Sequence, residues 1–167
     1  MKRRSILLTF LLAIFFASCN EDQLVDTTVM PEETTTGKNT FGCLVNGWLY
    51  VGGRYSDLYG TFSPQPSIYF VYNKSTNKMN VEVKVKDKGE GYEYLAFTIN
   101  EPVENEQCTF TDARWLDKSS LNDNSIELGS GTVKITKFNE NEKIISGRFY
   151  SNENKPITHG RFDVQYR

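Results

Sequence analysis

The chain contains a single histidine, His159, and this scarcity removes most catalytic and metal-binding schemes. A serine or cysteine nucleophile needs a neighbouring base, and no GxSxG turn presents such a nucleophile. His159 falls on the polar side of its segment with Arg161 and Asp163, so we expect it to face solvent. Residues 122–127 offer oxygen ligands but lack the glycine and glutamate spacing of an EF-hand loop. We therefore expect no catalytic residues, no metal site and no cofactor.

Runs of basic residues are missing after the first four positions. Only Lys84, Lys86 and Lys88 approach such a run, and their alternation is typical of the wet face of a strand. Three of the nineteen basic residues and none of the twenty-one acidic ones precede Cys19, so the chain from Cys19 onward carries a net charge of minus five. Acidity without a basic cluster argues against nucleic acid as a partner.

Long apolar runs are missing as well. The longest, residues 6–16, is about half of the roughly twenty residues that a membrane-spanning helix needs. It follows a positively charged N-terminus and ends in small residues, which is the arrangement of an export signal. Phe16 would lie three residues before a cut at Cys19, where ordinary signal peptidase requires a small residue. We predict that residues 1–18 are a signal peptide removed before Cys19.

The stretch Phe16-Ala17-Ser18-Cys19 resembles the lipobox of bacterial lipoproteins. The resemblance implies that Cys19 becomes the diacylated first residue, so that the membrane is a partner through a lipid anchor. Residues 19–38 are polar, acidic and rich in threonine. Because they show no apolar periodicity from which to build a core, they predict a flexible tether.

Two short patterns in this tether are similar to signals of Bacteroidetes lipoproteins. Glu21 and Asp22 are similar to the acidic signal that sends such proteins to the outer face of the outer membrane. Asp26-Thr27-Thr28 is similar to the motif at which these bacteria attach O-glycans, which implies O-glycosylation of Thr27. A plain acidic linker is the alternative for both patterns. We expect a lipid-anchored protein of the outer membrane, with periplasmic and surface orientations both open.

Cys43 and Cys108 are the two cysteines left for the folded domain, and neither belongs to a redox CxxC pair. Outside the cytoplasm a disulfide between them would persist, and it would contribute about 4 kcal/mol by the chain-entropy model. Two buried free thiols are the alternative, since Cys43 lies in an apolar segment and Cys108 lies beside Phe110. Both states remain open from the sequence.

Residues 39–167 predict one all-β domain. Two apolar runs, 41–45 and 48–51, flank Asn46-Gly47, the pair best suited to a type I′ hairpin turn. Residues 79–86 alternate between apolar and polar without a fault, which predicts a strand with one buried face. Further strands are expected over residues 67–72, 92–99, 107–111, 132–138, 144–150 and 157–166.

Two segments, 52–66 and 113–131, are rich in turn-forming residues and predict long loops, the second with a short helical turn near 115–121. Short strands at regular spacing, without crossover helices, favour an antiparallel arrangement. We predict a β-sandwich or a partly open β-barrel of about eight to ten strands. The pattern does not separate these two architectures.

Both ends of this domain resemble small cell-envelope lipoproteins of Bacteroidetes whose function is unknown. The stretches that carry the resemblance are residues 39–47, 144–149 and 157–164. The resemblance implies an all-β fold and a place in the cell envelope, and it brings no catalytic residues.

Exposed aromatic rings are the remaining candidates for binding, because a flat face and a polar edge suit stacking on sugars or anchoring a protein partner. The candidate ligand-contact residues are Trp48, Tyr55, Tyr59 and Trp115. A purely structural role is the alternative, since strands favour aromatic residues. We expect a non-enzymatic binding module for a glycan or another envelope protein, acting through its loops. A structural subunit of an outer-membrane complex, with no small ligand, is the second interpretation.

Overall fold

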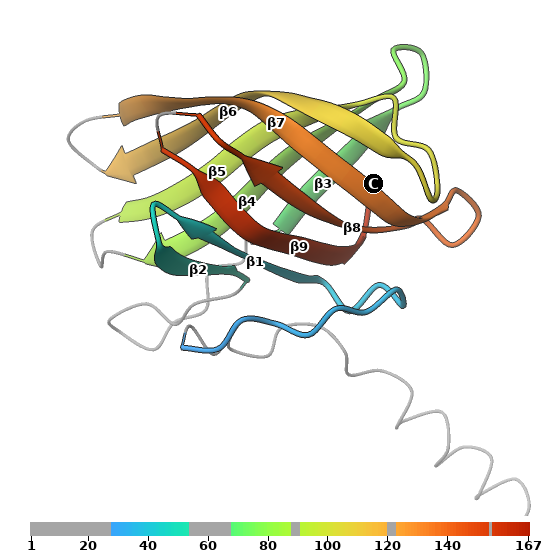
Figure 1. Cartoon of the computed structure of the whole chain (residues 1–167), viewed down its shortest axis with the longest axis horizontal. Helices are drawn as coiled ribbons and strands as arrows, with labels where there is room; N and C mark the ends of the chain where they lie inside the picture. Colours follow the sequence, from blue (N-terminus) through green and yellow to red (C-terminus); the bar gives the residue numbers. More distant parts are fainter. Residues whose placement is uncertain (1–27, 54–67, 88–90, 120–122, 154) are drawn as a thin grey trace, which may run out of the picture.

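The structure of the chain is a computed structural model that describes residues 28–53, 68–87, 91–119, 123–153 and 155–167. Within these ranges the chain forms nine β-strands (Figure 1). They are β1 (Thr40–Val45), β2 (Trp48–Gly52), β3 (Ile68–Asn73), β4 (Lys78–Asp87), β5 (Gly91–Asn100), β6 (Gln107–Ser119), β7 (Asp123–Asn139), β8 (Ile144–Ser151) and β9 (Ile157–Gln165). The described ranges hold no helix that could cross a membrane. The predicted all-β fold class is confirmed.

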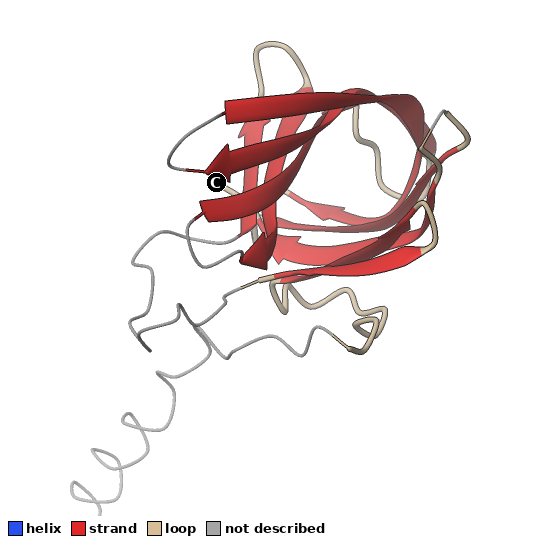
Figure 2. Ribbon diagram, turned by 90° about the vertical axis from the view of Figure 1, so that its left-hand side faces the viewer, coloured by secondary structure: helices blue, strands red, loops and turns tan. Residues whose placement is uncertain are grey.

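All nine strands belong to one antiparallel sheet in the order β2-β1-β9-β8-β7-β6-β5-β4-β3. Strands β3 to β9 form a meander, and the β1–β2 hairpin is added beyond β9. The sheet curls until its two edges meet. At this seam the amide of Arg167, just after β9, donates to the carbonyl of Phe70 on β3 at 2.8 Å. A second hydrogen bond crosses the seam: the amide of Gly53, just after β2, donates to the carbonyl of Lys84 on β4 at 3.3 Å. The result is a nearly closed barrel (Figure 2).

The strongest local signals in the sequence are confirmed. Asn46 and Gly47 have positive φ angles of 51° and 83°, and Val45 pairs with Trp48 across the turn. These angles are the ones that a type I′ turn requires at its two central positions. The apolar residues at alternate positions of β4 point inward, and each is at most 3% exposed: Met79, Val81, Val83 and Val85.

The prediction of an irregular loop over residues 113–131, with a helical turn near 115–121, is wrong. Strands β6 and β7 continue through most of this range as a paired ribbon. Asp112 has φ 57° and Gly129 has φ 87°, and the register between the two strands shifts next to them. The turn-forming residues thus serve as bulges within long strands, which sequence composition alone does not distinguish from a loop.

Residues 28–39, named the strap here, lie along the outside of the barrel (Figure 1). Pro31 covers Gly42 of β1 so closely that an added Cβ there would lie 2.6 Å from the proline ring. The ion pairs between the strap and strands β8 and β9 are Glu33–Arg148 and Glu33–Arg161. The strap therefore contacts three adjacent strands of the sheet.

Asp163 of β9 holds the strap in place. Its side chain is 1% exposed, although it lies on the outer face of the sheet. The donors to its carboxylate are Thr34 Oγ1 (2.5 Å), the amides of Thr36 (3.0 Å), Gly37 (2.8 Å) and Lys38 (3.2 Å), and Ser146 Oγ (2.7 Å). The predicted tether over residues 19–38 is therefore too long, because residues 28–38 belong to the folded unit. Its first part, residues 19–27, lies outside the described residues.

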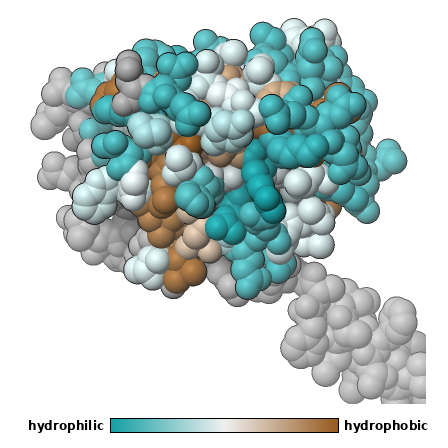
Figure 3. Space-filling view, viewed as in Figure 1, coloured by the Kyte–Doolittle hydropathy of each residue, from teal (hydrophilic) through white to brown (hydrophobic). Residues whose placement is uncertain are grey.

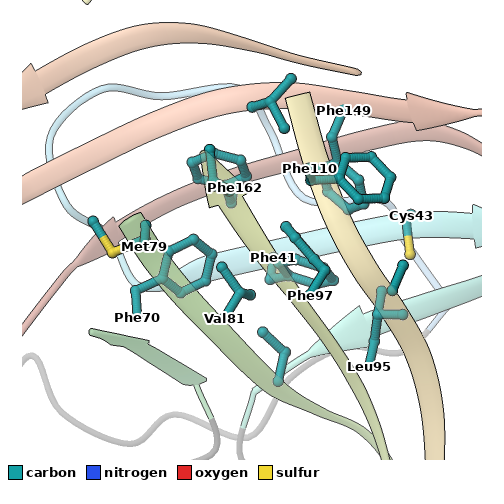
Figure 4. Close-up of a cluster of buried hydrophobic side chains, with 14 of the residues drawn as sticks. Phe41, Cys43, Phe70, Met79, Val81, Leu95, Phe97, Phe110, Phe149 and Phe162 are labelled. Atoms are coloured by element: carbon teal, nitrogen blue, oxygen red, sulfur yellow. The ribbon is translucent and has the colours of Figure 1, made fainter. Parts of the chain in front are cut away.

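Six phenylalanine side chains fill the middle of the barrel (Figure 4). They are Phe41, Phe70, Phe97, Phe110, Phe149 and Phe162, each at most 3% exposed. The ring of Phe149 lies at the centre, with centroid distances of 5.3 Å to Phe41, 5.2 Å to Phe97 and 6.2 Å to both Phe110 and Phe162. This part of the interior is a packed core and not a chamber for a ligand.

Gly160 of β9 makes room for the central ring. A Cβ added at Gly160 would lie 2.5 Å from the carbonyl oxygen of Phe149 and 2.6 Å from its ring. We expect Gly160→Ala to lower the free energy of unfolding by about 2 kcal/mol, because overpacking a filled core strains its neighbours. Urea denaturation measures this loss. An unchanged midpoint would show that both the ring of Phe149 and its backbone carbonyl can move aside without cost.

Candidate functional site

The aromatic residues predicted from the sequence as ligand contacts differ in their exposure. Trp48 on β2 is 73% exposed and remains available to a partner. Trp115 packs against the core, with its ring edge-on to Tyr50 at a centroid distance of 4.6 Å. Tyr55 and Tyr59 lie outside the described residues, as do Cys19 and Thr27. Trp115 is therefore at least partly a packing residue.

The two cysteines of the domain are free thiols, so the disulfide that the sequence left open is absent. Three strands, β9, β8 and β7, separate Cys43 on β1 from Cys108 on β6. Burial raises the pKa of the Cys43 thiol to about 12 and also raises the pKa of Cys108. Neither thiol is an activated nucleophile under such conditions.

His159 is exposed, as expected, and sits with φ 54° at an irregularity in the β1–β9 pairing. Asp163, which the sequence placed on the same polar side of the segment, is covered by the strap. Among the described residues no three His, Cys, Asp or Glu side chains gather in a way that could hold a metal ion.

A concave feature lies on the outer face of strands β3 to β6. It is a hollow of about 520 Å³. The side chains around it include Tyr69 and Val71 of β3, Asn80 and Glu82 of β4, Ala96 and Thr98 of β5, and Asp112 and Arg114 of β6. We call this feature the outer hollow. The sequence predicted no site here, because the residues at these positions match the pattern of solvent-exposed faces of ordinary strands.

Strand register explains the shape of the outer hollow. Tyr69 is paired with Glu82, Glu82 with Ala96, and Ala96 with Arg114, so the four side chains form one row across the sheet. The methyl group of Ala96 lies between longer side chains and forms part of the floor. Since cross-strand neighbours on one face lie about 5 Å apart, the walls stand roughly 10 Å from each other.

The next row supplies more polar groups to the floor and one wall. Val71 pairs with Asn80, which pairs with Thr98, and the Thr98 hydroxyl donates to Asn80 Oδ1 at 3.3 Å. Asp112 stands at the bulge of β6, where its φ of 57° interrupts the regular alternation of side chains. A bulge re-aims side chains in this way without ending the strand. The outer hollow therefore combines apolar, amide, hydroxyl and charged groups.

Two residues give the outer hollow much of its binding chemistry. Arg114 is exposed, and within the described part of the chain its side chain makes no ion pair or hydrogen bond. Its guanidinium group therefore retains five donors for a ligand. The ring of Tyr69 is held by Arg167, whose guanidinium carbon lies 4.9 Å from the ring centroid and whose Nη1 donates to the tyrosine hydroxyl at 3.3 Å.

Comparison of the chain with known protein families, curated proteins and solved structures returns no match. Geometry therefore defines its class: an all-β, nearly closed barrel with a packed aromatic core and a polar hollow on its outer face. The resemblance to envelope lipoproteins remains a prediction from the sequence.

Proposed function

We propose that this protein is a lipid-anchored, non-enzymatic binding module of the outer membrane whose outer hollow binds a glycan. The observation that carries this proposal is the set of side chains around Ala96, where an aromatic ring, an amide, a hydroxyl and an exposed guanidinium group share one concavity. Sugar hydroxyls pair with amides, carboxylates and guanidinium groups, and sugar C–H faces pack on aromatic rings. The anchor is the predicted lipid on Cys19.

The proposed site lies on the outer face of the barrel and not in its interior. Phenylalanine side chains fill the middle of the barrel, so an interior site would require the core to be rebuilt. The hollow is open to solvent and lies on paired strands of the sheet, which fix the positions of its side chains. Such a shallow, mixed surface suits a sugar chain that extends beyond it. The binding surface is then the sheet face and not the loops that the sequence suggested.

A structural subunit without a small ligand is the less favoured function. Such a subunit needs a broad apolar surface for its partner. Among the described residues, the large apolar side chains that are exposed are Val29, Trp48, Val71, Val103, Ile126 and Tyr150, and they are spread over different elements. The face seen in Figure 3 is mostly hydrophilic, with a hydrophobic band near its middle and smaller separate hydrophobic patches.

Replacement of Arg114 tests the proposed site. We expect Arg114→Ala to weaken binding of the glycan identified on a glycan array by about 10- to 150-fold, because a charge-assisted hydrogen bond contributes roughly 1.5–3 kcal/mol. Titration calorimetry with that glycan measures the change. Lys155→Ala is the matched control, since Lys155 is exposed in the turn between β8 and β9, two strands that do not line the hollow.

Two outcomes would contradict the proposal. Equal affinity for the glycan in Arg114→Ala and Lys155→Ala would remove the outer hollow as the site. A mass spectrum of the chain isolated from membranes that shows residues 1–18 still present, or Cys19 without acyl groups, would remove the anchor.

A further inference from the structure

Tyr69 supplies the aromatic wall of the outer hollow, and it lies on β3, an edge strand of the sheet. Within the sheet, β3 is paired with β4 on one side only. The ring is half-buried, and a side chain in such a place can change rotamer unless a further contact holds it. Its pose matters, because a sugar can pack only on a ring face that the protein leaves open. The contacts that Tyr69 makes on the other side of β3 therefore bear on the site.

Arg167 pairs with β3 across the seam of the barrel. Its amide donates to the carbonyl of Phe70 at 2.8 Å, and its carbonyl accepts from the amide of Tyr72 at 3.0 Å. Because β3 and β9 are six steps apart in an antiparallel order, they run in the same direction, and these two bonds form a parallel pair. The pair places Arg167 beside Val71, whose side chain lines the hollow. The side chain of Arg167 therefore lies on the same outer face as the hollow.

The guanidinium group of Arg167 binds Tyr69 in two ways. Its carbon lies over the ring, 4.9 Å from the centroid, and its Nη1 donates to the tyrosine hydroxyl at 3.3 Å. A cation over the ring together with a hydrogen bond to its polar edge restricts both the tilt and the rotamer of the side chain. Arg167 thereby occupies one face of the ring. A sugar in the hollow has to use the opposite face or the edge.

We propose that Arg167 is a positioning residue of the glycan site, which acts by presenting one chosen face of the Tyr69 ring to the sugar. This inference rests on the proposed function of the outer hollow. The residues that line the hollow include Tyr69 and Arg114 but not Arg167. The two arginines therefore have different tasks, because Arg114 donates to the glycan and Arg167 stands behind the ring. Without the Arg167 side chain, binding has to order a free ring as well as the sugar.

Side-chain substitutions separate this task from closure of the barrel. The two hydrogen bonds that join Arg167 to β3 are made by its backbone, so they remain in Arg167→Met. Methionine keeps a long unbranched side chain but has neither the charge nor the N–H donors of arginine. The urea midpoint of this variant should stay close to that of the unaltered chain, because Arg167 is exposed.

Fluorine NMR tests the pose of the ring without any ligand. The full chain is labelled with 3-fluorotyrosine and purified from membranes in detergent, and Tyr69→Phe identifies the Tyr69 signal among those of the nine tyrosines. We expect Arg167→Met to shift this signal toward the position of free fluorotyrosine and to narrow it, because the ring is no longer held. Arg114→Met should leave the signal in place. An unchanged Tyr69 signal in Arg167→Met would overturn the positioning role.

Binding is measured with a printed oligosaccharide array as the probe, and the glycan with the strongest signal is then titrated by calorimetry. We expect Arg167→Met to weaken the binding of that glycan by about two- to tenfold, the cost of ordering one free side chain. Arg167→Lys, which keeps a cation near the ring, should recover part of the loss. Lys155→Met is the matched control and should bind as the unaltered chain does, because Lys155 lies between two strands that do not line the hollow.

A double-mutant cycle distinguishes positioning of the ring from direct contact with the sugar. In a Tyr69→Leu background the ring is gone, so Arg167→Met should have no further effect on the affinity. Arg114→Met should weaken binding in both backgrounds, because Arg114 acts on the glycan itself. An equal loss from Arg167→Met with and without the ring would contradict action through Tyr69.

Failure of this inference and failure of the proposed function give different results. An unshifted fluorine signal in Arg167→Met, in a chain that binds an array glycan, would overturn only the role of Arg167. A shifted signal in a chain that binds no array glycan would overturn the proposed function of the hollow, and with it the use of the ring that Arg167 holds.

Discussion

Phe149→Ala is expected to lower the free energy of unfolding by about 4 kcal/mol, a large part of the 5–15 kcal/mol typical of a domain. Phe149 is 1% exposed and its ring lies within 6.2 Å of four other phenylalanine rings. Truncation removes the apolar area of the ring and leaves a cavity. Because the surrounding rings come from β1, β5, β6 and β9 of a nearly closed sheet, the backbone cannot readily collapse into that space.

Urea denaturation followed by tryptophan fluorescence measures this loss. Tyr150→Ala is the matched control, since Tyr150 is the next residue on β8 and is 47% exposed on the outer face. It should cost less than about 1 kcal/mol. If Phe149→Ala does not fold, Phe149→Leu should still fold and cost about 1–2 kcal/mol. Similar losses in Phe149→Ala and Tyr150→Ala would contradict the assignment of Phe149 to the centre of the core.

The sequence predicts well those features that depend on neighbouring residues. Alternation in β4 and the Asn46-Gly47 turn are local, and both are confirmed. The long β6–β7 ribbon was missed because its polar residues resemble a loop unless the pairing partner is known. The outer hollow was missed for a related reason. It arises where Ala96 meets Glu82 and Arg114 across two strand pairs, and no pattern within a single strand reveals that register.

The strap was missed because its stabilisation comes from the other end of the chain. Residues 28–38 contain few apolar side chains, and composition alone indicates a soluble tether. The acceptor that orders them, Asp163, is more than 120 residues away in sequence from its strap donors. A single buried carboxylate can order a polar segment when that segment directs several N–H and O–H groups at it. The sequence of the strap does not show this arrangement, because the strap and Asp163 come together only in the folded barrel.

Asp163→Ala is expected to lower the free energy of unfolding by about 3 kcal/mol and to release the strap. The substitution leaves the hydroxyls of Thr34 and Ser146 and three backbone amides without their acceptor. Breaking a buried charged network costs about 3–5 kcal/mol. The lower end applies here, because water can reach the donors once the strap has left the surface. Faster hydrogen exchange at Thr36, Gly37 and Lys38 should accompany the loss, while amides in β4 and β5 keep their protection.

The same network predicts how stability responds to acid. Burial alone would raise the pKa of Asp163, but the donated hydrogen bonds outweigh this effect and hold the pKa below its usual value. A carboxyl with a depressed pKa in the folded state stabilises above its unfolded pKa of about 3.9 and loses that contribution as the pH falls through the lower, folded value. The strap should therefore stay bound from pH 7 to about pH 5 and be released only in stronger acid. If Asp163→Ala keeps native protection in the strap, or loses as much stability between pH 4 and pH 2 as the unaltered protein, other contacts hold the strap.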